Sequence, residues 1–252
     1  MKKFYAICIL MLLPVLALAA CSDISVNGTQ SPAASSAVLK GKIVQIYNGS
    51  CLIAGSGSSE LYTVPTKLDV FDVNNKQADA SALKTGQTVE VGYSGAIMES
   101  FPAQPGNPAY IRITGQEDDL VGFYMTVLND LWNVDDGLNP DAGVLAFDLS
   151  QVANLTGAEK NALVYLVSNF HGLQGITGTF DELVEQGLID NKNLFFKDGM
   201  LFAFKITDVT ESSFTFDVSK WRGGTGAYFF NNCKAVKSGG SWSYTVGSTA
   251  IS

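Results

Sequence analysis

The segment Thr156-Gly-Ala-Glu-Lys-Asn-Ala-Leu-Val-Tyr-Leu-Val-Ser-Asn-Phe-His-Gly172 carries the clearest fold signal of the sequence. A Thr followed three residues later by Glu is a capping box, in which the two side chains accept hydrogen bonds from free backbone N–H groups at a helix start. Gly172 can close the helix in the left-handed conformation. The segment therefore predicts a helix with one buried face, made of Leu163, Leu166, Val167 and Phe170.

Two further helices are predicted on either side of this segment. Leu120, Tyr124, Val127, Leu128 and Leu131 recur at helical spacing and predict an amphipathic helix before it. After it, the stretch from Thr179 to Glu182 repeats the capping box, and Gly187 marks the end of a short helix.

The residues that follow the helices alternate as strands do. Asp198-Gly199 separates the apolar runs 194–196 and 200–202 and predicts a hairpin. Phe214, Phe216 and Val218 alternate with polar residues, and further strands are predicted at 227–230 and 242–246. Helices followed by strands indicate an α+β domain over 116–252, with two to three helices packed on one face of an antiparallel β-sheet.

The part before the helices, 38–115, consists of short runs of period two separated by turn residues. Several strands at such spacing predict a small antiparallel barrel or sandwich. The stretch from Leu83 to Val91, followed by 93–104 with its Glu-Ser-aromatic-Pro-Ala-Gln motif, resembles the YobA-like domains of unknown function in exported proteins of Gram-positive bacteria. The resemblance implies an OB-like barrel and a lipoprotein context, and it brings no activity. Pro105-Gly-Asn-Pro108 makes an unusually broken entry to the last strand.

The N-terminus predicts export. Lys2 and Lys3 precede an uncharged apolar run from Phe4 to Ala20, which is short for a bilayer span and typical of a cleaved signal peptide over 1–20. Leu-Ala-Ala-Cys21 resembles the lipobox of bacterial lipoproteins. That resemblance implies a lipid on Cys21 and a protein anchored at the extracytoplasmic face of the cell membrane. An ordinary secretory signal and an uncleaved membrane helix are the alternatives. Residues 21–37 are small and polar and predict a flexible tether.

The charge of the chain limits the classes of partner, and its cysteines allow two states. Without its signal the chain keeps 14 basic and 24 acidic residues, a net charge of −10, which disfavours nucleic acid. The partners that remain are the membrane, through Cys21, and a protein or small molecule of the envelope. Cys51 and Cys233 are predicted to be buried thiols, with a disulfide between them as the alternative.

Several residues are candidates for ligand or cation binding. The loop carrying Asp135, Asp136 and Asp141 is rich in the oxygen atoms that calcium takes, although it does not follow the EF-hand spacing, and a solvated acidic surface is the alternative. The other candidates are Glu99, which could instead order a turn, and Trp221 with Arg222, which could form a lip at the sheet edge or stabilise the fold.

No catalytic, metal-binding or cofactor motif stands out. His171, at the end of a helix, is the single histidine of the chain, and its place there suggests a capping cation. The sequence thus favours a binding or interaction module without a cofactor. The alternative is an exported hydrolase that uses carboxylates of the acidic segment 130–148, such as Asp135, Asp136 or Asp148.

Overall fold

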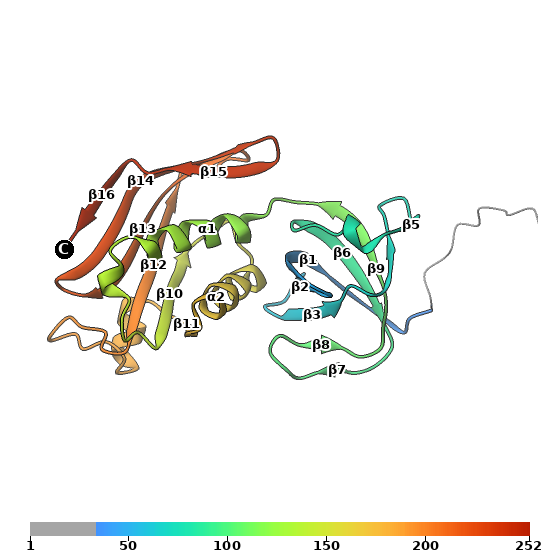
Figure 1. Ribbon diagram of the computed structural model, residues 1–252, viewed down its shortest axis with the longest axis horizontal. Coiled ribbons are helices and arrows are strands. Elements are labelled where there is room, and N and C mark those ends of the chain that lie inside the picture. The colour runs from blue at the N-terminus through green and yellow to red at the C-terminus, as the bar shows by residue number, and fades with distance from the viewer. Residues whose placement is uncertain (1–33) are drawn as a thin grey trace, which may run out of the picture.

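The computed structural model describes residues 34–252 (Figure 1). The predicted signal peptide, Cys21 and the tether up to residue 33 lie outside the described residues, so their assignments remain predictions. From residue 34 onward, no helix combines the length and the apolar character that crossing a membrane requires.

The first sheet has seven strands in the order β3-β2-β1-β6-β9-β4-β5. These are β1 (Ala37–Tyr47), β2 (Ser50–Gly55), β3 (Leu61–Pro65), β4 (Asp69–Phe71), β5 (Gln77–Ala78), β6 (Gln87–Tyr93) and β9 (Pro108–Gln116). A short 3-10 helix (Ala80–Ala82) precedes β6. The sheet curls around its own apolar cluster, which includes Ile43, Val89 and Ile111.

This sheet departs from the prediction of a purely antiparallel barrel. β4 pairs with β9 in parallel, and β3 and β5 end the sheet on opposite sides without a described pairing between them. The hairpin β7 (Ile97–Met98) and β8 (Gln104–Pro105) instead extends to the edge at β3. There, the N–H of Ala103 donates to the carbonyl of Leu61 at 2.8 Å, and the N–H of Thr63 donates to the carbonyl of Ala103 at 2.9 Å.

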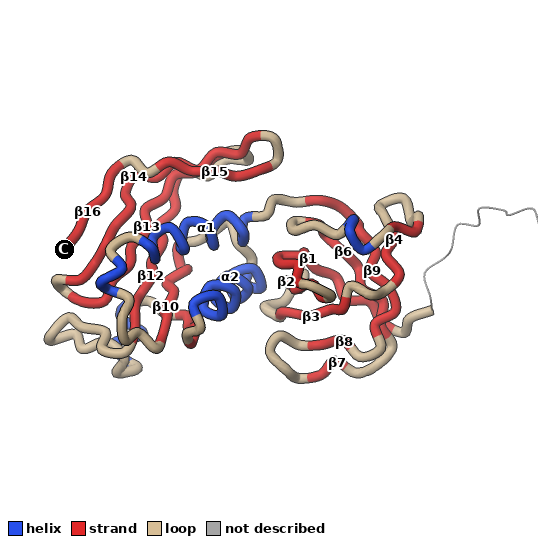
Figure 2. The backbone as a smooth tube through the Cα atoms, viewed as in Figure 1, coloured by secondary structure: helices blue, strands red, loops and turns tan. Residues whose placement is uncertain are grey.

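The second sheet follows the order β11-β10-β12-β13-β14-β15, with β16 also paired to β14. Its strands are β10 (Val144–Gln151), β11 (Gln174–Thr177), β12 (Gly199–Thr207), β13 (Ser213–Gly223), β14 (Gly226–Ser238), β15 (Ser241–Thr245) and β16 (Ser248–Ile251). The helices are α1 (Leu120–Asn133), α2 (Gly157–His171) and α3 (Phe180–Glu185), with a 3-10 turn at Asp136–Leu138. The predominance of strands with three α-helices agrees with the α+β class (Figure 2).

The predicted helix ends are confirmed. Thr156 with Glu159 and Thr179 with Glu182 both form complete capping boxes, and Gly172 closes α2 with φ +67°. Leu163, Leu166 and Val167 are buried as predicted. Phe170, which was predicted to be buried with them, lies in the last turn of α2 and is 70% exposed.

Two strand predictions are wrong. Asp198-Gly199 is not a hairpin turn: the carbonyl of Asp198 accepts hydrogen bonds from the N–H groups of Gly143 and Val144, which align β12 in parallel with β10. Residues 194–196 form no strand, and only Phe195 makes isolated bridges. The second sheet is also mixed rather than antiparallel, because the unpredicted strand β10 pairs in parallel with both β11 and β12.

The helices join the two sheets through one apolar core. α1 and α2 lie against the second sheet and extend toward the first (Figure 1). Val44, Leu52 and Leu61 of the first sheet belong to the same buried cluster as the apolar faces of both helices and of β12–β14. The boundary between the two predicted domains, at 115/116, therefore crosses a continuous core, although the division itself remains a prediction.

Candidate binding cleft

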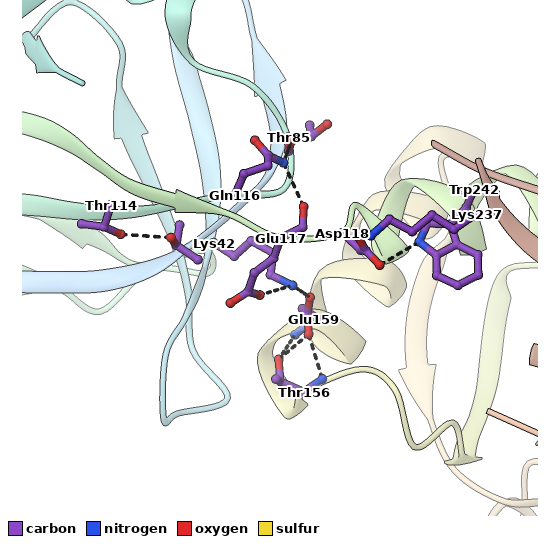
Figure 3. Close-up of polar contacts among 11 residues, drawn as sticks. Lys42, Thr85, Thr114, Gln116, Glu117, Asp118, Thr156, Glu159, Lys237 and Trp242 are labelled. Carbon is purple, nitrogen blue, oxygen red and sulfur yellow. Dashed lines mark hydrogen bonds and ion pairs between the residues drawn. The ribbon is translucent and has the colours of Figure 1, made fainter. Parts of the chain in front are cut away.

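A buried ion pair fastens the first sheet to α2 (Figure 3). Lys42 of β1 places its Nζ 2.6 Å from Oε1 of Glu159 and 2.8 Å from Oε2 of Glu117. The Glu159 side chain is only 4% exposed, and its other oxygen accepts hydrogen bonds from the backbone and hydroxyl of Thr156. Burial by itself would lower the pKa of Lys42, but the hydrogen bonds and charges of the two glutamates raise it above its usual value, so Lys42 is a cation at neutral pH.

An open cleft of about 890 Å³ lies beside this joint, and we call it the junction cleft. Its walls come from the first sheet and its turns, from the segment leading into α1, from α1 itself and from the β14–β15 hairpin. The lining residues are Ile46, Lys84, Thr85, Gln116, Glu117, Asp119, Gly122, Phe123, Thr126, Gly240, Ser241, Trp242, Ser243 and Tyr244. The volume is within the range of small-molecule sites, which favour such junctions between structural units.

Hydrogen bonds hold the two aromatic residues of β15 that line the cleft. The Trp242 indole N–H donates to Oδ2 of Asp118 at 3.1 Å, and Lys237 pairs with the other oxygen of that carboxylate (Figure 3). The Tyr244 hydroxyl donates to Oδ2 of Asp130 at 2.6 Å. Burial, together with this carboxylate, raises the pKa of Tyr244, so the hydroxyl stays protonated. One wall of the junction cleft is therefore a fixed aromatic surface.

The acidic loop binds the side-chain ammonium of one of the protein's own lysines. The ammonium of Lys220 on β13, whose residue is fully buried, donates to the carbonyls of Trp132, Val134 and Asp135 and to Oδ1 of Asn139. Burial lowers the pKa of Lys220 to about 8, while the nearby carboxylates of Asp135 and Asp136 raise it, so the group is mainly protonated at pH 7.

Arg222, two residues after Lys220 on β13, also holds this loop. Its guanidinium donates to the carbonyl of Leu138 at 2.7 Å and to the carbonyl of Pro140. The predicted lip is not formed, because alternate strand residues face opposite ways: Trp221 packs edge-to-face on Phe180 with ring centroids 5.2 Å apart. Arg222 is thus used to hold the loop.

The loop carboxylates themselves, Asp135, Asp136 and Asp141, are exposed. Within residues 34–252, no three His, Cys, Asp or Glu side chains gather as a metal site would require. Calcium binding remains a prediction, but several loop oxygens already accept from Lys220 and Arg222. Asp148 accepts from the backbone and hydroxyl of Ser150 and lines clefts that neither Asp135 nor Asp136 lines.

The remaining candidates lie apart from the junction cleft. Glu99 is exposed on the β7–β8 hairpin. His171 stacks on Trp132 with ring centroids 4.2 Å apart and bonds Oδ1 of Asn129, and burial lowers its pKa, so it links α2 to α1 rather than acting as a capping cation. Cys51 and Cys233 are free, buried thiols, as the favoured prediction stated.

Sequence reasoning missed Lys220 and the aromatic wall. A signal for Lys220 was present: Phe214, Phe216, Val218 and Lys220 follow one another at period two, which places the lysine on the buried face of its strand. The aromatic wall depends on how the β14–β15 hairpin folds over α1, and no local pattern reports that.

Neither protein-family models, nor curated proteins, nor solved structures give a match to this chain. The junction cleft must therefore be interpreted from its own chemistry.

Proposed function

We propose that this protein is a lipid-anchored, extracytoplasmic binding protein that takes a carbohydrate chain of the cell envelope in the junction cleft. The observation that carries the ligand class is the pairing of a fixed aromatic wall, Trp242 and Tyr244, with hydroxyl, amide and charged side chains on the other walls. Aromatic rings pack against the apolar C–H faces of sugar rings, and the polar side chains hydrogen-bond the hydroxyls.

The charge of the chain supports this class of ligand. The protein is strongly acidic, so a polyanion such as nucleic acid would be repelled, whereas a neutral polyol would not. The location follows from the signal peptide and from the lipobox-like tetrapeptide ending at Cys21, which are sequence features alone. No observation favours the hydrolase alternative, since no contact joins Asp135, Asp136 and Asp148 in a common site.

The first sheet is proposed to be an OB-like barrel of the YobA-like kind. The support is its curl, together with the β7–β8 hairpin, which contacts the open edge at β3 through Ala103. This assignment concerns the fold and adds nothing about the ligand.

The ligand proposal is tested by the fluorescence of Trp242. In a chain carrying Cys21→Ser, Trp132→Phe and Trp221→Phe, Trp242 is the one tryptophan left. Hexamers of β-1,4-linked N-acetylglucosamine and of β-1,4-linked glucose are the probes. We expect a saturable change of emission with at least one of them.

Position 126 supplies the matched variants for this titration. Thr126 is exposed on α1 and lines the cleft. Thr126→Tyr should fill the cleft and abolish the response, and Thr126→Ala should preserve it. Carbohydrate binding in the cleft is refuted if neither hexamer changes the emission or if Thr126→Tyr leaves the response intact.

The anchor is tested separately in bacteria that produce the full chain. An alkyne analogue of palmitate should label the protein and place it in the membrane fraction, and Cys21→Ser should abolish both. A labelled Cys21→Ser protein would contradict the proposed anchor.

A further inference from the structure

A second groove, distinct from the junction cleft, runs between α2 and β11, and we call it the α2–β11 groove. It has a volume of about 680 Å³. It is lined by Phe101, Asn161, Val164, Tyr165, Ser168, Asn169, Leu173 and the whole of β11. Phe101 reaches it from the β7–β8 hairpin and meets Tyr165 edge-to-face at 5.6 Å.

The strand on one side of this groove has a free hydrogen-bonding edge. β11 is the last strand of its sheet and pairs only with β10. The N–H groups of Gln174 and Gly178 donate toward β10, at 3.0 and 3.1 Å. Because N–H groups of a strand alternate in direction, those of Gly175 and Thr177 point away from β10, and no hydrogen bond to another described residue satisfies them.

The helix approaches this free edge closely because Gly175 has no side chain. A Cβ at Gly175 would lie 2.3 Å from Oγ of Ser168 and 2.9 Å from a methyl group of Val164. The Ser168 hydroxyl is buried and has no hydrogen-bond partner in the described structure. The floor of the groove is therefore strand backbone, against which α2 packs closely.

Two further hollows adjoin the groove. Phe101 also lines a hollow with Ile97 and Met98 of the β7–β8 hairpin. These three side chains are exposed by 65%, 36% and 54%, respectively, so together they form an apolar patch. Asn161 and Thr177 also line a third cleft.

Charge distinguishes the two adjoining hollows from the groove. No charged side chain lines the α2–β11 groove itself. Glu60 and Glu99 line the hollow of the hairpin, and Asp148 and Glu182 line the third cleft. The one cation that lines either hollow is Lys160, whose ammonium donates to the carbonyl of Leu149 at 2.8 Å.

We infer that this groove binds an extended polypeptide segment, which adds a strand to β11 and has apolar central residues flanked by lysine or arginine. The backbone of the segment pairs with the free groups of Gly175 and Thr177. Its central side chains pack on Val164, Tyr165 and Phe101, and its basic flanking residues meet the carboxylates of the two adjoining hollows. The partner is thus a basic protein segment of the envelope.

The test uses a pool of fluorescein-labelled peptides of about nine residues, the length of an ordinary strand with flanks. Two lysines stand at each end, and Val, Ile, Thr, Phe or Tyr stands at each central position. Fluorescence anisotropy with the Cys21→Ser chain at low salt reports binding. We expect saturable binding that weakens as salt rises, and no binding by a pool whose central amides are N-methylated.

Exchanging one carboxylate tests the charge argument. Glu99→Lys should weaken binding about fivefold or more at low salt, because it puts a like charge beside the lysines. Glu211→Lys, an equal charge change at another exposed position, should alter it less than about twofold. Far-ultraviolet circular dichroism confirms that both variants fold.

Three results would overturn the inference. The first is no anisotropy change with the lysine-flanked pool. The second is equal binding of the N-methylated pool, which would exclude strand addition. The third is that the chain self-associates in analytical ultracentrifugation and that Glu99→Lys abolishes this association. The occupant of the groove would then be a second copy of the protein.

Discussion

Replacing Lys42 with methionine should destabilise the whole described structure by about 3 kcal/mol, which is the lower end of the loss when one partner of a buried ion pair is removed. Methionine keeps the apolar stem but leaves the carboxylate of Glu159, 4% exposed, without its cation. The lower end applies because Thr156 still donates two hydrogen bonds to that carboxylate. Since one core spans both sheets, the loss should move a single unfolding transition rather than the first of two.

The assay is urea unfolding of the Cys21→Ser chain, followed by tryptophan emission and by circular dichroism. Adding Glu159→Gln to Lys42→Met should restore part of the stability, because no buried charge is then unpaired. Lys40→Met is the control: Lys40 also pairs with a glutamate, but its side chain is 67% exposed, so the change should stay below about 1 kcal/mol. A loss below about 1 kcal/mol for Lys42→Met, or equal losses for the two lysines, would show that the pair does not hold the joint.

Three further outcomes follow from buried groups. Lys220→Met should destabilise the chain by about 2 kcal/mol in the same urea assay, since the carbonyl of Val134 loses its donor, while those of Trp132 and Asp135 keep one each; an unchanged midpoint would contradict this. Because the pKa of His171 is lowered in the folded state, the unfolded chain binds more protons below about pH 6.5. The melting temperature should therefore fall from pH 7.5 to 5.5, and His171→Gln should reduce that fall; equal slopes would refute the assignment. Burial raises the pKa of Cys51 to about 12 and of Cys233 to about 11, so a thiol reagent at pH 8 should label both only after unfolding, and mass spectrometry that finds either labelled in the folded chain would contradict it.

The features that the sequence predicted are those that a few neighbouring residues determine. Both capping boxes, the glycine that ends α2 and most of the buried face of that helix depend on contacts within one or two turns. The hairpin predicted at Asp198-Gly199 does not form, because β12 pairs instead with a strand that is distant in the sequence. The competing partner of β12 is β10, some fifty residues earlier in the chain, and the N–H groups of Gly143 and Val144 take the Asp198 carbonyl.

Strand β10 was missed because its sequence context is misleading. It overlaps the acidic segment 130–148, in which no strand was predicted, but its middle residues Leu145, Ala146 and Phe147 are all fully buried. Such a run is typical of a strand covered on both faces, which period-two alternation does not detect. Once β10 is placed, the unit β10-α2-β11 follows, and with it the free edge of β11. The α2–β11 groove could therefore not be predicted from the sequence, because its prediction requires that of β10.

The two proposed binding surfaces share a dependence on the joint between the sheets. The junction cleft takes one wall from the first sheet and another from the β14–β15 hairpin. The α2–β11 groove takes Phe101 from the β7–β8 hairpin, which pairs with the edge of the first sheet, and its other residues from α2, β11 and the turn between them. A relative movement of the sheets would therefore change both surfaces at once. Lys42, bound to Glu117 at the cleft and to Glu159 at the start of α2, is the one side chain with ion pairs on both sides of that joint among the residues described. Because a ligand stabilises the arrangement that it binds, occupation of either surface should favour the geometry of the other.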